Sequence, residues 1–501
     1  MSEYIVRGNI MTMTGMGRYA GALGVSSGLI RAVGTPEEVG AVMPPGTEVK
    51  DFGSALITPG LVDTHMHPLT TGIALAGADL SDAGSLGALL DTLRLKAEVT
   101  ARGEWIIGTR FQDKRIAERR FPTRKELDTV TVDHPVMVQH NDIHFLQLNT
   151  PGLVRLRGNT GGTGYFKDPE SMDIIELFQK NMPREKKIDY MRSVCRLAAT
   201  RGITELHVKE VWENLEPLLS VESSLPVRLK PLVFVLGPDD PGIDTVLEDP
   251  GLRGRAVLCL INDGTLDGHT AALQEPYADL PDCAGDTLFS DADLARFIGK
   301  AFKAGVQVSI HAVGDRTIEQ ILRVVGRLLP GYPGLDHRLR IEHFEMPAPG
   351  QVRRAVDLGI TAGVQPMLIP VCQGLDFNGY RPFVGDRVIR ANTFKSYIDA
   401  GMLIAGGSDS PVTPLDPFQG IAAAVNHPTE AERLTFFEAL GLYTVNAARI
   451  AFEEEKGGTL EPGKRADFTV IDYDPESGSG LPASGAVLAV FTGGHCVHGG
   501  D

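Results

Sequence analysis

The sequence is poor in cysteine and in long apolar runs. Among 501 residues there are 5 cysteines, no two of which form a Cys-x-x-Cys pair: Cys195, Cys259, Cys283, Cys372 and Cys496. An odd and scattered set makes a disulfide framework improbable, so we expect a reducing, cytoplasmic location. No basic stretch followed by an apolar one opens the chain, and no apolar run reaches the roughly 20 residues that cross a bilayer. We therefore expect neither a signal peptide nor a membrane span.

Basic residues are also in deficit. Lys and Arg number 48 against 64 Asp and Glu, which gives a formal net charge of -16. Nucleic-acid binding needs clustered basic residues that contact phosphates, so we expect no nucleic-acid partner. Hydrophobic residues make up 43% of the chain, which excludes a disordered protein. A chain of this length can bury a large core, and its composition is compatible with a homo-oligomer.

Both ends of the chain carry short predicted strands. Near the N-terminus they fall at 4–7, 11–13, 22–25, 29–33 and 48–51, with one helical stretch at 36–42. Near the C-terminus they fall at 467–472 and 486–491. Two β-rich ends that flank an α/β middle can pair with each other. We therefore predict a composite β-sandwich domain from residues 1–57 and 457–501.

The middle of the chain alternates apolar runs of strand type with helical segments such as 291–303 and 317–329. The runs lie at 61–64, 203–208, 229–235, 256–261, 306–310, 339–341, 360–364 and 403–405. Eight parallel strands with crossover helices make a (β/α)8 barrel, which we predict over residues 58–456. The first gap is too long for one crossover. It predicts an insertion at about 79–187, with strands at 105–108 and 136–139, as a lid or pocket wall.

Ligand-type residues stand at the ends of four of these runs. His65 and His67 follow the first run, and side chains at i and i+2 of a strand point to the same side. His311 follows the fifth run, His343 the sixth and Asp409 the eighth. A lone His-x-His pair is weak evidence, but four histidines and an aspartate at strand ends predict a metal centre at the mouth of the barrel.

Five short motifs extend this pattern over nearly the whole chain. In order they are PGLVDTHMH at 59–67, HAVGD at 311–315, RIEH at 340–343, GSDSP at 407–411 and GKRADF at 463–468. Together they resemble the amidohydrolase superfamily of metal-dependent hydrolases, in the amidohydrolase 3 branch that includes N-substituted formamide deformylase. The resemblance implies a (β/α)8 barrel, a β-sandwich built from both termini, and one or two divalent ions, usually zinc.

The resemblance also implies roles for the ligand-type residues. His65, His67 and Asp409 would hold a first ion, and His311 and His343 a second. A water molecule activated by the metal, with its pKa lowered towards neutrality, would be the nucleophile. Asp409 would remain ionised beside the cations, take a proton from that water and pass it to the leaving nitrogen.

One position departs from the family pattern. Similar proteins usually have a carboxylated lysine on the fourth strand that bridges both ions, and Cys259 stands there in this chain. A thiolate can also bind or bridge zinc, so we expect Cys259 to be a metal ligand. The alternative is a small buried hydrophobic residue beside a site with one ion. A less favoured alternative is that Lys209, beside His207 at the second strand, replaces the bridging lysine.

Three further features are candidates for the substrate pocket. His144, in the insertion, stands where similar proteins have a histidine, and we predict that it polarises the substrate carbonyl; a structural hydrogen bond is the alternative. His269 stands where relatives often have an arginine, so this chain departs from the family at the position that would bind an anionic group. The apolar loop 365–373, with a glutamine at each end, is predicted to line the pocket.

These features predict an enzyme that hydrolyses a non-peptide carbon–nitrogen bond, an amide or formamide of a small molecule. A first alternative is a deaminase of heterocycles. Such relatives usually have a glutamate three residues after the strand-five histidine, where this chain has Gly314 followed by Asp315. A second alternative is a non-catalytic barrel that has lost its metal bridge.

Overall fold

The computed structural model describes residues 3–15, 19–140, 145–167, 170–474 and 480–499. It divides into two units, which are described separately. The first comprises Met1–His67, Cys195–Leu215 and Glu222–Asp501, and the second Pro68–Val194 and Glu216–Val221. The predicted insertion at about 79–187 falls within the second unit. The boundaries between the predicted β-sandwich and barrel domains, at residues 57 and 457, remain a prediction. No helix in the described ranges is both long enough and apolar enough to cross a membrane.

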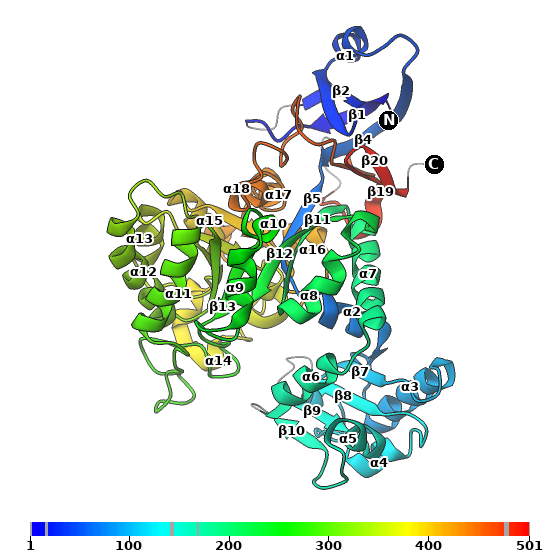
Figure 1. Ribbon diagram of the computed structural model, residues 1–501, viewed down its shortest axis with the longest axis vertical. Helices are drawn as coiled ribbons and strands as arrows, with labels where there is room; N and C mark the ends of the chain where they lie inside the picture. Colours follow the sequence, from blue (N-terminus) through cyan, green and yellow to red (C-terminus); the bar gives the residue numbers. More distant parts are fainter. Residues whose placement is uncertain (1–2, 16–18, 141–144, 168–169, 475–479, 500–501) are drawn as a thin grey trace. The chain divides into compact units, whose positions relative to one another are not determined.

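The first unit contains an all-parallel sheet of eight strands (Figure 1). Each strand overlaps one of the eight predicted runs, which confirms the (β/α)8 fold. In sheet order the strands are β5 (Leu61–Met66), β11 (Ile203–Glu210), β12 (Arg228–Phe234), β13 (Val257–Ile261), β14 (Gln307–Ala312), β15 (Arg340–His343), β16 (Thr361–Val364) and β17 (Ile404–Gly406). Their near-continuous burial is typical of parallel strands covered on both faces.

The first and last strands of this sheet meet and close the barrel. Thr64 Oγ1 donates to Gly406 O at 2.9 Å, and Met66 forms a parallel bridge with Ser410. Gly407 permits the close approach: a Cβ there would lie only 2.7 Å from His65 N, whereas one at Gly406 would overlap the Tyr443 ring. Small residues at the end of β17 therefore place the residues that follow it directly against the end of β5.

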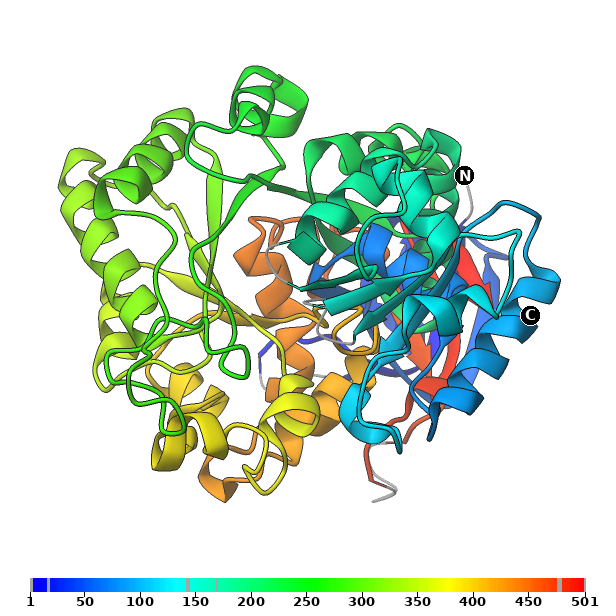
Figure 2. The ribbon, with the colours of Figure 1, turned by 90° about the horizontal axis from the view of Figure 1, so that it is seen from below.

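Helices connect the strands of the first unit. They are α9 (Pro241–Glu248), α10 (Pro250–Arg253), α11 (Asp291–Ala304), α12 (Asp315–Leu328), α13 (Gln351–Asp357), α14 (Arg381–Val384), α15 (Phe394–Asp399), α16 (Pro417–Val425), α17 (Phe436–Leu442) and α18 (Val445–Ile450). The helix α11 begins at a Ser290–Asp293 capping box and ends at Gly305, whose φ is +68°. Figure 2 shows α11 and α12, in yellow-green, outside the strands.

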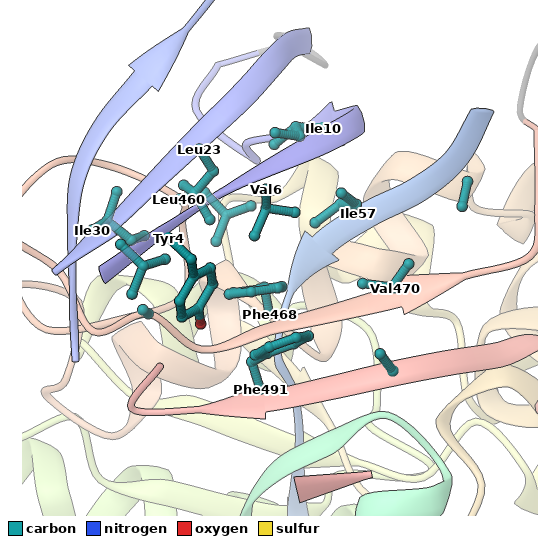
Figure 3. Packing of buried hydrophobic residues seen from close by; sticks show 14 residues of the cluster. Tyr4, Val6, Ile10, Leu23, Ile30, Ile57, Leu460, Phe468, Val470 and Phe491 are labelled. Atoms are coloured by element: carbon teal, nitrogen blue, oxygen red, sulfur yellow. The ribbon is translucent and has the colours of Figure 1, made fainter. Parts of the chain in front are cut away.

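Strands from both termini form the expected β-sandwich, and their hydrogen bonds join them into one sheet of seven strands. In sheet order they are β20 (His495–Gly499), β19 (Val487–Thr492), β18 (Phe468–Ile471), β4 (Glu48–Pro59), β1 (Glu3–Met11), β2 (Tyr19–Ser26) and β3 (Leu29–Gly34), with α1 (Pro36–Val42) beside them. Tyr4 lies three strands from Phe491, about 14 Å in a flat sheet, yet their ring centroids are 5.8 Å apart (Figure 3). The sheet therefore folds over its own core, which includes Phe468.

Three details of these strands differ from the prediction. The prediction of a separate strand at 11–13 is wrong. The strand β1 continues to Met11, and Met13 has a φ of +59°, which lies outside the extended region. The strand predicted at 48–51 is longer and continues to Pro59, where it pairs with both termini. The strand β20 was not predicted, since it is polar and largely exposed and lacks an apolar period.

The second unit has its own sheet of five strands, in the order β10, β9, β8, β7, β6. Its elements are α2 (Pro68–Ala76), β6 (Ala78–Asp79), α3 (Leu86–Val99), β7 (Ile106–Phe111), α4 (Arg124–Asp128), β8 (Val136–His140), β9 (Phe145–Leu148), α5 (Thr150–Arg157), β10 (Tyr165–Lys167) and α6 (Glu170–Lys180). The helices α7 (Arg184–Thr200) and α8 (Trp212–Leu219) each cross a boundary between the units. The strands predicted at 105–108 and 136–139 correspond to β7 and β8.

Candidate metal centre

His65 and Asp409 meet at the seam where the barrel closes. Asp409 N donates to His65 O at 2.7 Å, and His67 N donates to Ser410 O at 2.9 Å. Across this seam, Asp409 Oδ1 lies 3.3 Å from His65 Nε2 and 3.2 Å from His67 Nε2. Two imidazole nitrogens therefore face the same carboxylate oxygen.

Histidines from the fifth and sixth strands complete the cluster. One ligand atom each of His65, His343 and Asp409 lies within 4.8 Å of the others, which in the described part of the chain is the single group of this kind. The His65 ring lies 5.6 Å from the His67 ring and 5.3 Å from the His343 ring, and the His311 ring lies 4.4 Å from the His343 ring. The structure thus brings these five residues together at the ends of four strands.

The spacing of these atoms suits a bound cation. Two ligands about 2.0–2.1 Å from a tetrahedral zinc ion lie about 3.3 Å from each other, close to the two distances measured at Asp409 Oδ1. His65 Nε2 is buried and has no hydrogen-bond partner among the described residues. Buried polar atoms are normally satisfied, so this nitrogen indicates a missing partner. The donor set of imidazoles and a carboxylate therefore fits a divalent metal ion.

The ionisation of the cluster also suits a cation. Burial raises the pKa of the Asp409 carboxyl, but the facing His65 and His67 rings lower it more, and it ends well below its usual value. Burial, together with the neighbouring His311, lowers the pKa of His343 well below its usual value. Burial also lowers the pKa of His65, whereas Glu342 and Asp409 raise it further, so the net change is a rise. Positive charge is thus favoured at His65, between the two carboxylates, and a divalent ion bound at Nε2 supplies that charge in place of a second ring proton.

Two of the clustered residues have a strained backbone. His343 has a φ of +70° and Asp409 a φ of +55°, in the left-handed region that residues other than glycine rarely adopt. Such conformations cost on the order of 1–3 kcal/mol each and persist where the surrounding structure imposes them. They occur here at the ends of β15 and β17, where they aim the side chains into the cluster.

Asp263 lies beside His311, on the Nδ1 side of its ring. The Asp263 carboxylate accepts from the backbone N–H groups of Val313 at 3.0 Å, Gly314 at 2.9 Å and Ala272 at 3.1 Å. Its Oδ1 also lies 3.3 Å from His311 Nδ1. A carboxylate beside one ring nitrogen is the usual arrangement of a histidine whose other nitrogen binds a metal.

Glu342 is a site residue to which the sequence reasoning assigned no role. It is fully buried, and its Oε2 lies 2.8 Å from His65 Nδ1. Arg340 lies 2.9 Å from its other oxygen. The available signal was two charged residues on either side of Ile341 in a short predicted strand, because buried charges are rare unless they are paired.

Cys259 lies in the barrel interior and outside the clustered group. It is buried on β13 against Leu232, Val257 and Phe234, and no group of three closely spaced ligand atoms in the described ranges includes it. Burial raises the pKa of its thiol. Lys209, buried on β11, places its Nζ 5.8 Å from the Phe234 ring centroid. Its charge acts to lower the pKa values of three clustered histidines: His65, His67 and His343.

The remaining pocket candidates have different outcomes. His144 lies outside the described residues. His269 Nε2 lies 3.0 Å from the Asp279 carboxylate, so this imidazole already has an anionic partner. In the loop 365–373, Gln365 Oε1 and Gln373 Nε2 are buried and have no hydrogen-bond partner in the described part of the chain. Unsatisfied amide atoms of this kind suit a loop that contacts a ligand.

Comparison with known proteins identifies the family. The model of the amidohydrolase family matches residues 48–477. YtcJ of Bacillus subtilis, which carries a provisional amidohydrolase assignment, is 28% identical over 93% of this chain and 94% of its own. The N-substituted formamide deformylase of Arthrobacter pascens is 26% identical over 94% of this chain and 93% of its own. A metal-dependent hydrolase of uncharacterised function from Pyrococcus horikoshii is 25% identical, with a TM-score of 0.82, 99% of this chain covered and 100% of the other. The chain belongs to the amidohydrolase family.

Proposed function

We propose that this amidohydrolase hydrolyses a non-peptide carbon–nitrogen bond, that of an amide or formamide, in a small molecule. The convergence of His65, His343 and Asp409 carries the proposal, because it supplies both a metal-binding donor set and a carboxylate for proton transfer. The similarity to a formamide deformylase over almost the whole chain supports the substrate class. The odd, scattered cysteines support our proposal of a cytoplasmic location.

We assign His65, His67 and Asp409 to a first divalent ion and His311 and His343 to a second, with zinc as the proposed metal. When bound, such an ion polarises the substrate carbonyl and lowers the pKa of water. Cys259 stays a proposed additional ligand, and Lys209 the less favoured substitute. Neutral imidazoles and an ionised carboxylate are the forms that bind a cation, and the pKa shifts of His343 and Asp409 favour them.

The proton transfers are assigned to Asp409. Its carboxylate is ionised and faces the same space as the His65 and His67 nitrogens, so it can take a proton from the attacking water. The same proton can then pass to the nitrogen of the leaving amine as the carbon–nitrogen bond breaks. His144 remains our proposed group for polarising the substrate carbonyl.

A panel of substrates tests the reaction class. We expect the purified protein, loaded with zinc, to convert N-substituted formamides or related small amides into an amine and a carboxylate, measured by amine release and by formate. Amino-heterocycles should release no ammonia. Ammonia from those compounds, with none of the amides cleaved, would instead establish the deaminase alternative.

The structure around Gly314 favours amide hydrolysis over that alternative. A Cβ at Gly314 would overlap the Ala272 carbonyl, so this position cannot carry a glutamate without rearrangement. The neighbouring Asp315 accepts from Gln274 N at 2.8 Å and pairs with Arg390 at 3.3 Å. Its carboxylate is therefore engaged in linking loops and is not available as a proton shuttle.

His311→Ala tests the assignment of the fifth strand. We expect kcat/KM to fall by about 100-fold or more, because the loss of Lewis-acid stabilisation is worth several kcal/mol. Metal content should fall in parallel, while the circular dichroism spectrum should remain that of the wild type. His337→Ala is a suitable control, since His337 accepts and donates only to backbone groups of residues 339 and 358. Full activity in the His311 variant would remove this residue from the site.

A further inference from the structure

The Glu342 carboxylate is surrounded by three donors inside the barrel. Arg340 Nη2 lies 2.9 Å from Oε1, and Ser309 Oγ donates to the same oxygen at 2.6 Å. The second oxygen, Oε2, faces His65 Nδ1 at 2.8 Å. Since Arg and Ser already act on Oε1, the oxygen that faces His65 is left as an acceptor, and His65 Nδ1 must carry the hydrogen.

The opposite edge of the imidazole then has no hydrogen. A neutral ring protonated at Nδ1 presents a lone pair at Nε2. That nitrogen is the buried atom that lacks a hydrogen-bond partner among the described residues and lies 3.3 Å from Asp409 Oδ1. Two electron-rich atoms at this distance repel each other unless a proton or a metal ion lies between them. The hydrogen bond from Nδ1 to Glu342 thus leaves a lone pair at Nε2, which needs a positively charged partner.

The backbone and the next strand hold this contact in place. Arg340 Nη2 also donates to Thr64 O at 2.8 Å, so the guanidinium binds both the carboxylate and the residue before His65. On β16, a Cβ at Gly363 would overlap Glu342 Oε2. The absence of a side chain at Gly363 therefore leaves the space that the carboxylate occupies.

Arg340 is in turn oriented by a second histidine deeper in the barrel. Arg340 Nη1 lies 3.2 Å from His207 Nδ1, and a guanidinium can only donate, so Nδ1 is the acceptor. The hydrogen of neutral His207 is then on Nε2, which lies 3.5 Å from Glu205 Oε1. In this polar chain from Glu205 to His65, neutral His207 is therefore protonated at Nε2 and neutral His65 at Nδ1.

We propose that Glu342 is a positioning residue of the metal centre: it holds His65 in the tautomer protonated at Nδ1 and so directs the Nε2 lone pair at the ion. This inference deepens the proposed function, because it concerns the same site. Glu342 itself neither binds the ion nor contacts substrate. A glutamine in its place can accept at its oxygen only. Its NH2 group would then face either the Arg340 and Ser309 donors or the His65 donor, and one of these hydrogen bonds would be lost.

Zinc affinity, measured by competition with a chromophoric chelator, is the first test. We expect Glu342→Gln to weaken zinc binding by about 10- to 100-fold, the usual effect of losing such an outer partner. Glu432→Gln is the matched control, since Glu432 is also a buried carboxylate but binds Ser396 and belongs neither to the metal cluster nor to the polar chain that ends at His65, and it should keep the wild-type affinity. Unchanged affinity in the Glu342 variant would overturn the proposal.

Gly363→Ala provides a second variant, which keeps the charge of Glu342. The added methyl group displaces Oε2 from His65, so zinc affinity should fall in the same direction. Circular dichroism verifies that each variant is folded. If Glu342→Gln does not fold, the Gly363 variant alone decides, and wild-type affinity in a folded Gly363→Ala protein would contradict the proposal.

The tautomer can be read without any metal or activity. In metal-free protein labelled with 15N-histidine, at a pH high enough for the His65 ring to be neutral, we expect the His65 resonance, identified by its loss in His65→Gln, to show a protonated Nδ1 in the wild type. The Glu342→Gln variant should shift it towards protonation at Nε2. A neutral wild-type ring that is protonated at Nε2 instead of Nδ1 would overturn the inference. Should the wild type bind no metal, the proposed function would fail, while this spectrum would still decide the tautomer.

Discussion

Replacing Asp409 by asparagine should lower kcat by about 1,000-fold, within the range expected when a group that transfers protons is lost. Asn keeps the shape of the side chain but cannot take a proton from water. It also removes the negative charge that faces His65 and His67 at 3.3 Å and 3.2 Å, so metal affinity should fall as well. Steady-state kinetics at saturating zinc separate the two effects, since added metal can restore binding but not proton transfer.

The matched control for this variant is Asp416→Asn. Asp416 is buried in the segment that follows β17 and caps the N-terminus of α16 through the Phe418 and Gln419 N–H groups. Asparagine caps a helix about as well as aspartate, so this change should leave both stability and activity close to those of the wild type. Equal activities of the two variants at saturating zinc would show that Asp409 is not the proton-transfer group.

Removal of the metal should reduce turnover to the level of the uncatalysed reaction. The cluster contains four imidazoles and one carboxylate, and imidazole-rich sites prefer zinc and neighbouring transition metals to magnesium or calcium. After treatment with a chelator and its removal, we expect zinc, cobalt or nickel to restore turnover and magnesium to have no effect. Metal analysis of the restored enzyme also counts the ions. Two equivalents would favour a bridging ligand such as Cys259, and one would favour the alternative of a buried thiol.

Thermal stability provides a second readout of the same experiment. A ligand at about 100 times its Kd stabilises the folded state by about 2.7 kcal/mol, so the metal-free protein should melt at a lower temperature than the restored one. Turnover that persists in protein shown to contain no metal would refute the mechanism. A protein that takes up no zinc and cleaves no amide would support the non-catalytic barrel.

Much of the fold could be predicted because buried strands and helix ends have recognisable local sequence patterns. The barrel strands are buried, so several of them appear as apolar runs, as at Val257–Ile261. The capping box at Ser290 and the glycine at position 305 delimit α11 in the same local way. The polar and exposed β20 lacks such a pattern, and it was missed.

The identities of the clustered residues could also be predicted, since the ends of parallel strands meet at one rim. All five lie at or just after such ends: His65, His67, His311, His343 and Asp409. The motifs extended this to a family, which the match over residues 48–477 confirms. Both inferences depend on order along the chain and on the types of residue present. Neither requires knowledge of distances.

Only the tertiary structure decided which groups face one another. Glu342 and His65 are separated by 277 positions in the chain, and their 2.8 Å contact depends on the stagger of the barrel strands and on the space left at Gly363. The backbone angles that aim His343 and Asp409 are likewise imposed by their surroundings against local preference. Local patterns determine strands and helices, because those depend on near neighbours. The pairing of buried polar groups depends on packing between distant segments, so it cannot be predicted from a local sequence pattern.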